Sequence, residues 1–199
     1  MRVMFHNLSR RYCILIVAGF TFAGTCLPAA AGLLSKMNYM LHSWPPDHRV
    51  KKLIVTGNYV KPRILAELVQ HQTKNPILLV SPGESGNNLY FLPYGPEAMP
   101  LDEEECVEFI ELVNPKQVLL LGDSRYVPDS ISEKIQRQVS SVRVNSSNWA
   151  KNAKTLSDMF MYQNLRARFA DMYDKVKDAS DSAEASRTRQ DAVLAPLGE

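Results

Sequence analysis

The chain has 199 residues, of which 45% are hydrophobic and 22% are charged. This composition is typical of one globular domain that buries a core, and it excludes collagen-like and broadly disordered chains. The 23 Lys and Arg residues against 21 Asp and Glu residues give a net charge of +2. A nucleic-acid-binding protein needs a concentrated basic face, so the composition argues against that class.

The first 31 residues have the pattern of a secretory signal peptide. Arg2, Arg10 and Arg11 precede an apolar run over residues 13–27, and the alanines at 29–31 supply a cleavage site. We therefore expect an exported protein, periplasmic, extracellular or associated with the cell envelope, with residues 32–50 as a linker. Two alternatives stay open: an uncleaved, tilted membrane anchor, and a lipid anchor on Cys26.

Short apolar runs alternate with amphipathic segments from residue 51 onward. This pattern predicts strands at residues 52–56, 76–80, 117–121 and 142–144, and helices at residues 60–72, 101–113 and 130–139. The second and third strands are apolar on both alternating faces, as in a sheet that helices cover on each side. Alternation of strand and helix implies right-handed crossovers and a parallel sheet. The predicted fold is a three-layer α/β/α, Rossmann-like domain over residues 51–178 with about four parallel strands.

A long helix is predicted after the last strand, and Asn148 is its expected N-terminal cap. Apolar residues recur at steps of three and four from Trp149 to Val176. The second half of this helix extends beyond the size of a small domain, so its apolar stripe is expected to cover another part of the domain or a partner chain. Small and charged residues dominate afterwards, which predicts a disordered tail over residues 179–199.

Cysteine usage gives no basis for a disulfide or a metal centre. After loss of the leader, Cys106 is the only thiol, so neither an internal disulfide nor a Cys/His cluster is expected. Cys106 falls in a predicted helix, where a small buried apolar side chain explains it better than a reactive thiol. Since the chain also lacks a glycine-rich phosphate-binding motif, no cofactor is predicted.

Small polar residues follow each predicted strand. Ligands of an open parallel sheet bind beyond the carboxyl ends of its strands. The candidate ligand-binding residues at these ends are Asn58, Ser81, Glu84, Asp123, Ser124, Arg125 and Asn145. A structural alternative stays open, because Asn, Asp, Ser and Gly also cap helices and form turns.

Residues 81–100 form a long segment without a predicted helix or strand. The segment carries Tyr90, Phe91 and Tyr94, and long loops at the ligand edge of a sheet are often functional. Exposed aromatic rings suit stacking on sugar rings or binding of another protein. The alternative is a lid packed by its own aromatic side chains.

Gly122-Asp123-Ser124 is similar to the GDS nucleophile block of SGNH-type lipases and esterases. A serine nucleophile needs a base that takes its proton, and in that family the histidine lies late in the chain. The four histidines, at positions 6, 42, 48 and 71, all precede Ser124. The expected base is therefore missing, and no catalytic residue is assigned.

Three segments resemble cell wall-binding repeats of type 2 (CWB2): an apolar strand at residues 75–80, a strand with the following helix start at residues 116–131, and a turn at residues 142–150. The resemblance implies a module that attaches a surface protein to anionic envelope polymers, with Arg143 at the family's arginine position as an anion contact. Members of that family usually carry three repeats. One repeat implies either self-association or a module that has kept the fold and lost polymer binding.

These patterns together predict a non-catalytic, exported envelope protein that binds a wall polymer, a glycan or a protein partner, with homo-oligomerisation through its last helix. The alternative function is a small periplasmic or extracellular hydrolase that acts on a carbohydrate or a phosphate ester through a carboxylate such as Glu84 or Asp123.

Overall fold

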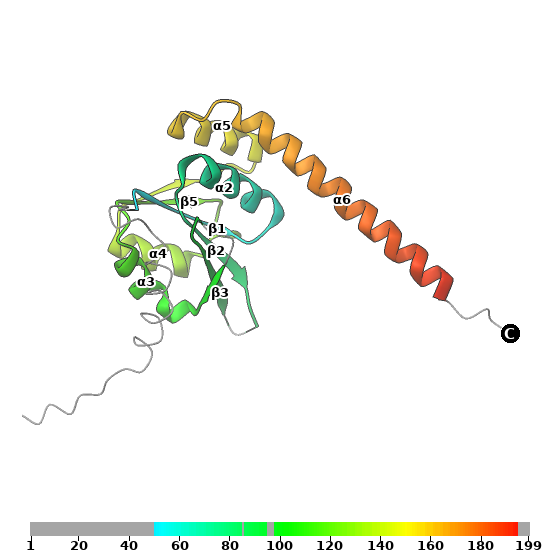
Figure 1. The fold of residues 1–199 in the computed structure, drawn as a ribbon. Coiled ribbons are helices and arrows are strands. Elements are labelled where there is room, and N and C mark those ends of the chain that lie inside the picture. The colour runs from blue at the N-terminus through cyan, green and yellow to red at the C-terminus, as the bar shows by residue number, and fades with distance from the viewer. Residues whose placement is uncertain (1–49, 85, 95–97, 195–199) are drawn as a thin grey trace, which may run out of the picture.

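Six strands form one mixed sheet in the computed structural model, which describes residues 50–84, 86–94 and 98–194. Their order across the sheet is β4-β3-β2-β1-β5-β6, and Figure 1 labels β3, β2, β1 and β5 of this series. The strands are β1 Lys52–Gly57, β2 Ile77–Pro82, β3 Asn87–Leu92, β4 Met99–Leu101, β5 Gln117–Leu121 and β6 Ser141–Val144. The helices are α2 Val60–Thr73, the 3-10 helix η1 Glu103–Glu105, α3 Cys106–Val113, α4 Asp129–Gln138, α5 Trp149–Phe160 and α6 Leu165–Leu194. The α/β class is confirmed, but the sheet is larger than predicted and is not wholly parallel.

The four predicted strands form the parallel part of the sheet. β1 pairs in parallel with β2 on one side and with β5 on the other, and β5 pairs in parallel with β6. Near the end of β1, Thr56 is level with Leu79 of β2 and Leu121 of β5. The carboxyl ends of these strands therefore lie at one edge of the sheet, which we call the carboxyl edge.

Both faces of the parallel strands β1, β2 and β5 are buried under helices. In β1, Leu53 and Val55 join the core cluster beside α3 and α4, whereas Ile54 joins the cluster beside α2, α5 and α6. Figure 1 shows these two groups of helices on opposite sides of the sheet. Alternating side chains buried on both faces explain why these strands are apolar along their length.

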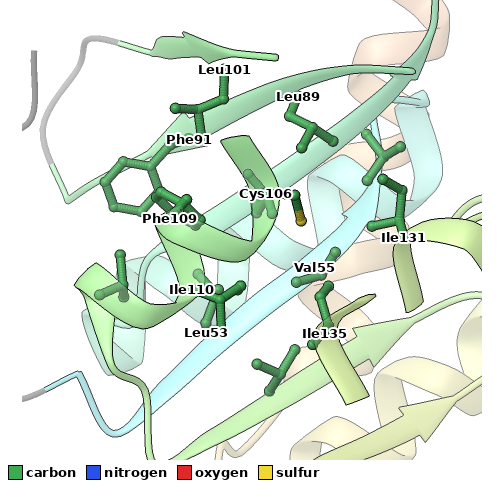
Figure 2. Close-up of a cluster of buried hydrophobic side chains, with 14 of the residues drawn as sticks. Leu53, Val55, Leu89, Phe91, Leu101, Cys106, Phe109, Ile110, Ile131 and Ile135 are labelled. Atoms are coloured by element: carbon green, nitrogen blue, oxygen red, sulfur yellow. The ribbon is translucent and has the colours of Figure 1, made fainter. Parts of the chain in front are cut away.

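The cluster beside α3 and α4 is drawn in Figure 2. There the rings of Phe91 and Phe109 meet with 4.8 Å between their centroids. Cys106 is buried in the same cluster, and this burial raises the pKa of its thiol to about 11. The prediction of a small buried side chain at Cys106 is confirmed.

The segment at residues 81–100 differs from its prediction as an element-free loop. It folds into β3 and β4, which extend β2 as antiparallel strands. Along β3, Leu89 and Phe91 are buried on one face, while Tyr90 and Leu92 pack against the cluster on the other. This period of two is that of a strand, so these aromatic residues belong to the sheet and its core rather than to a lid.

The C-terminal segment is two helices rather than the one predicted. The side chain of Asn148 caps α5 by accepting hydrogen bonds from the backbone N–H groups of Ala150 and Lys151, so the predicted cap is confirmed. The break follows α5, where Met161 and Asn164 have left-handed backbone angles, φ 52° and 62°. Met161 is the C-terminal cap of α5, a position where left-handed angles end a helix, whereas Asn164 directly precedes α6. Between them the chain turns so that α6 packs back on α2 and α5.

The predicted tail also differs, because α6 continues through residue 179 as far as Leu194. The predicted leader, including the alternative anchor at Cys26, and residues 32–49 of the predicted linker lie outside the described residues, whereas Val50 at the end of that linker is buried in the core. Within the ranges that the structure describes, no helix combines the length and the hydropathy that a membrane span requires.

Glu103 joins the β2–β3 hairpin to α4. Its carboxylate accepts hydrogen bonds from the backbone N–H of Asn87 at 3.1 Å and from the Asn87 side chain at 2.8 Å. The other carboxylate oxygen lies 3.0 Å from Nζ of Lys134. The hydrogen bonds from Asn87 and then Lys134 lower the pKa of Glu103.

Replacing Glu103→Gln is expected to lower the free energy of unfolding by about 1 kcal/mol at pH 7, because charge-assisted hydrogen bonds are lost. The folded-state pKa lies below the ordinary value of about 4.3. The stabilisation is therefore complete above that pH and disappears as the pH falls through the folded-state pKa. Urea unfolding of wild type and variant should show a difference that shrinks between pH 7 and pH 3.

Glu104→Gln is the matched control, because Glu104 is the exposed neighbour of Glu103 in η1. It should change stability by less than about 0.5 kcal/mol, as for an ordinary surface position. An undiminished Glu103→Gln deficit at pH 3 would contradict the assigned role of the carboxylate charge.

Candidate functional site

The carboxyl edge contains the topological switch point of the sheet. From β1 the chain moves to β2 on one side, whereas β5 lies on the other side and leads outward to β6. Connections that leave in opposite directions open a crevice at the strand ends, and this is where ligands of open α/β sheets bind. The candidate site is therefore the region around the ends of β1 and β5.

Tyr126 fills this crevice. A Cβ atom at Gly57 would lie 2.9 Å from the carbonyl oxygen of Tyr126, and one at Gly122 would lie 2.8 Å from its Cβ. The Tyr126 ring meets Tyr59 edge-on at 5.5 Å and Trp149 edge-on at 5.1 Å between centroids. Two glycines thus allow the loop after β5 to fold back over the strand ends.

Three strand-end turns bring predicted site residues to the carboxyl edge. Asn58 follows β1, the predicted residues Asp123, Ser124 and Arg125 follow β5, and Asn145 follows β6. Asp123 is partly buried and the other four are exposed. The prediction that the four turns share one edge is confirmed, because β2 is parallel to β1 and its carboxyl end also lies there, with Gly57 level with Val80.

The remaining predicted residues lie within strands or in a hairpin turn, not in turns that lead from a strand into a helix. Ser81 is still within β2, level with Asn88 of β3, and Glu84 is exposed in the hairpin turn that follows. The end of β2 therefore leads into a strand instead of a helix. Arg143 lies inside β6, level with Leu120 of β5, and its positive charge adds to the lowering of the pKa of Asp123.

Asp123 is held by Arg125. The guanidinium Nη2 lies 2.7 Å from Oδ2 of Asp123, and the backbone N–H of Arg125 donates to Oδ1 at 3.1 Å. Hydrogen bonds from the Arg125 side chain are the main cause of the lowered pKa of Asp123. At neutral pH this carboxylate is charged and both its oxygens are engaged, so it is poorly suited to donate a proton.

Ser124 is exposed at this edge without a neighbouring imidazole among the described residues. The one histidine in the described part of the chain is His71, in the last turn of α2. Because α2 starts at the carboxyl edge and has 14 residues, its far end lies about 20 Å away at 1.5 Å per residue. The structure does not bring together the serine and base that nucleophilic catalysis requires.

A groove of about 750 Å³ lies beside the filled crevice. It runs between the start of α2, the start of α5 and the first turns of α6. Its lining combines aromatic and charged side chains, among them Lys61, Trp149, Arg166, Phe169, Tyr173 and Asp174. Nζ of Lys61 lies 4.9 Å above the centre of the Tyr173 ring. The groove thus offers both an apolar wall and positive charge.

Asn152 fixes the turn between β6 and the groove. It is fully buried, and its side-chain oxygen accepts from the backbone N–H of Ser146 at 2.9 Å. Its side-chain nitrogen donates to the Ser146 carbonyl at 2.8 Å. This paired contact holds Trp149 at the corner shared by the crevice and the groove.

Sequence reasoning missed Asn152 and the three aromatic residues Tyr59, Tyr126 and Trp149. One signal was present: Asn58, Arg125 and Asn148 at the strand-end turns are each followed directly by an aromatic residue. No comparable local signal marks Asn152, because its role depends on a backbone group six residues away.

The described residues contain no cluster of three or more His, Cys, Asp or Glu side chains arranged to hold a metal ion. Comparison of the chain with family models, curated proteins and solved structures gives no match.

Gly122→Ala is expected to displace Tyr126 and to lower the free energy of unfolding by about 1–3 kcal/mol, the usual cost of overpacking. Gly86→Ala is the matched control, since both glycines have a positive φ, 109° at Gly122 and 154° at Gly86, but a Cβ at Gly86 would meet only Oε2 of Glu103 at 3.6 Å. Urea unfolding and near-UV circular dichroism measure the two effects. Equal losses of stability in both variants would contradict the role assigned to Tyr126.

Proposed function

We propose that the chain is a non-catalytic binding protein of the cell envelope, and that its carboxyl edge binds an anionic polymer or glycan. The supporting observation is the surface formed by Tyr59, Arg125 and Tyr126 over the closed crevice, next to the groove that Lys61 and Trp149 help to line. We call this surface with the groove the aromatic–basic edge.

The composition of the aromatic–basic edge suits a charged carbohydrate. The side chain of Arg125 is 73% exposed, and Tyr59 is 43% exposed. Flat aromatic rings provide apolar faces for sugar rings, while Arg and Lys bind phosphate and carboxylate groups. A groove on the surface suits a polymer better than a small substrate that must be enclosed.

Three further observations favour binding over hydrolysis. Tyr126 occupies the crevice that a substrate would enter, Ser124 has no described imidazole beside it, and the carboxylate of Asp123 is held in an ion pair that keeps it deprotonated. The resemblance to CWB2 modules supports an anionic envelope polymer as the ligand class. The leader pattern in the first 31 residues supports a location where such polymers occur.

The double variant Tyr59→Ala, Arg125→Ala is expected to bind a purified polyol-phosphate wall polymer at least about tenfold more weakly, because it loses one stacking face and one cation. Sedimentation of the protein with insoluble polymer, or titration calorimetry with a soluble fraction, measures the change. A neutral glucan in a separate arm distinguishes recognition of charge from recognition of the sugar ring.

Tyr94→Ala, Arg137→Ala is the matched control. Tyr94 is 50% exposed and lies beside Lys74 at the far end of α2, and the Arg137 side chain is 76% exposed near the far end of α4. Binding by this variant should equal wild type. Ester or glycoside turnover that disappears in Asp123→Ala, with polymer binding unchanged, would instead establish the hydrolase.

A further inference from the structure

Four lysines lie at the edge of the sheet opposite the carboxyl edge, which we call the amino edge. Lys51 and Lys52 stand at the start of β1, Lys116 directly precedes β5, and Lys74 lies three residues before β2. These three strands are parallel neighbours, so their starts lie side by side, about 4.8 Å from one strand to the next. The backbone N–H of Lys116 donates to the Val50 carbonyl at 3.2 Å, which places Lys116 beside the start of β1.

The charge of these lysines is not compensated by ion pairs. Within the described part of the chain, none of the four lies in a salt bridge. Lys51, Lys74 and Lys116 are exposed, and Lys52 is half-buried. Glu111, near the end of α3, is an exposed carboxylate at the same end of the domain, which leaves an excess of positive charge. Such a surface attracts an anionic partner.

Aromatic and apolar side chains accompany the lysines. Nζ of Lys52 lies 4.6 Å from the centre of the Phe160 ring, and Nζ of Lys74 lies 3.9 Å from the centre of the Tyr94 ring. Tyr94 is 50% exposed, and Met161, next to Phe160, is 92% exposed. Tyrosine rings and long basic side chains both settle at the headgroup level of a bilayer, where their apolar parts are buried and their polar ends reach water.

The chain also enters the domain at the amino edge. Val50 precedes β1 and is the first described residue, so residues 1–49 join the domain here. That part of the sequence contains the predicted export leader with its apolar run over residues 13–27. If the leader is retained as an anchor, or if Cys26 carries a lipid, the amino edge is the edge connected most directly to the membrane. This position favours a lipid surface over another anionic partner.

We propose that the amino edge binds an anionic phospholipid surface through Lys51, Lys74 and Lys116, with Tyr94 and Met161 entering the headgroup layer. The carboxyl edge then faces away from the bilayer. This inference does not depend on the polymer proposed as the ligand of the carboxyl edge.

Flotation of the full chain with vesicles tests the charge contact. Wild type is expected to bind phosphatidylglycerol–phosphatidylcholine vesicles at least about tenfold more tightly than pure phosphatidylcholine vesicles, and high salt should remove this preference by screening. Lys51→Glu, Lys116→Glu should weaken binding to the anionic vesicles at least about twentyfold, since each lysine near an anionic bilayer contributes about fivefold in affinity. The leader is the same in both proteins, so its own affinity for lipid is common to them.

Lys151→Glu, Lys177→Glu is the matched control. It makes the same change of charge at two exposed lysines of α5 and α6, away from the amino edge, and should bind the anionic vesicles like wild type. An equal loss in the control would show an effect of net charge alone. Unchanged vesicle binding by Lys51→Glu, Lys116→Glu, with loss of binding to a soluble polyol-phosphate polymer, would assign the lysines to a polymer. Either result would overturn the proposal.

An environment-sensitive fluorophore tests the orientation, and its signal does not depend on how tightly the leader binds. With Cys13 and Cys26 replaced by Ser, the label is attached at Met161→Cys or, as the control, at Tyr59→Cys on the carboxyl edge; Cys106 is buried and stays unlabelled. Anionic vesicles should shift the emission to the blue at position 161 and leave it unchanged at position 59. Equal shifts at the two positions, or a shift at position 59 alone, would exclude the proposed contact.

Discussion

The arrangement of the molecule depends on the burial of β1 from four directions. β2 and β5 pair with its two edges, and helical layers cover its two faces, so that Leu53, Ile54 and Val55 have no exposed surface. A polar group at such a position needs an internal partner. Thr56 has one, because its hydroxyl donates to the Leu121 carbonyl at 2.7 Å. The ends of β1 and β5 are thereby held side by side, and everything at the carboxyl edge is built on that pair.

The parallel core was predictable because its signal is local. Apolar runs at β1, β2 and β5, separated by amphipathic helices, are enough to specify buried parallel strands. The β3–β4 hairpin was missed because Leu89 and Phe91 alternate with residues that are themselves apolar or aromatic, which hides the period of two. β4 has only three residues, including Pro100, and is too short to predict from a pattern.

Prediction also failed where tertiary contacts overrule local preference. Neither Met161 nor Asn164 is the glycine that usually marks the end of a helix, yet both adopt left-handed angles. The buried Leu165 and Phe169 stabilise that turn by seating α6 on α2 and α5. The groove forms because α6 packs back on α2 and α5. No single segment of the sequence therefore predicts it.

At the carboxyl edge, the strand-end turns could be predicted from the sequence, but the filling of the crevice between them could not. Asn58, Arg125 and Asn145 were placed correctly as neighbours of strand ends. The filling of the switch point by Tyr126 was not predictable, because it requires Gly57 and Gly122 to lie next to each other across two strands. The result is a closed surface of rings and charges where an open cleft was expected.

The position of Cys106 has a consequence for the chemistry of the folded chain. A thiol with a pKa raised by burial is almost wholly neutral at physiological pH, and the neutral form neither attacks disulfides nor coordinates metals well. In an oxidising compartment this shields the thiol from mixed-disulfide formation as long as α3 stays packed on the sheet. The rate at which an alkylating reagent modifies Cys106 therefore reports how often that helix separates from β1, β2 and β3.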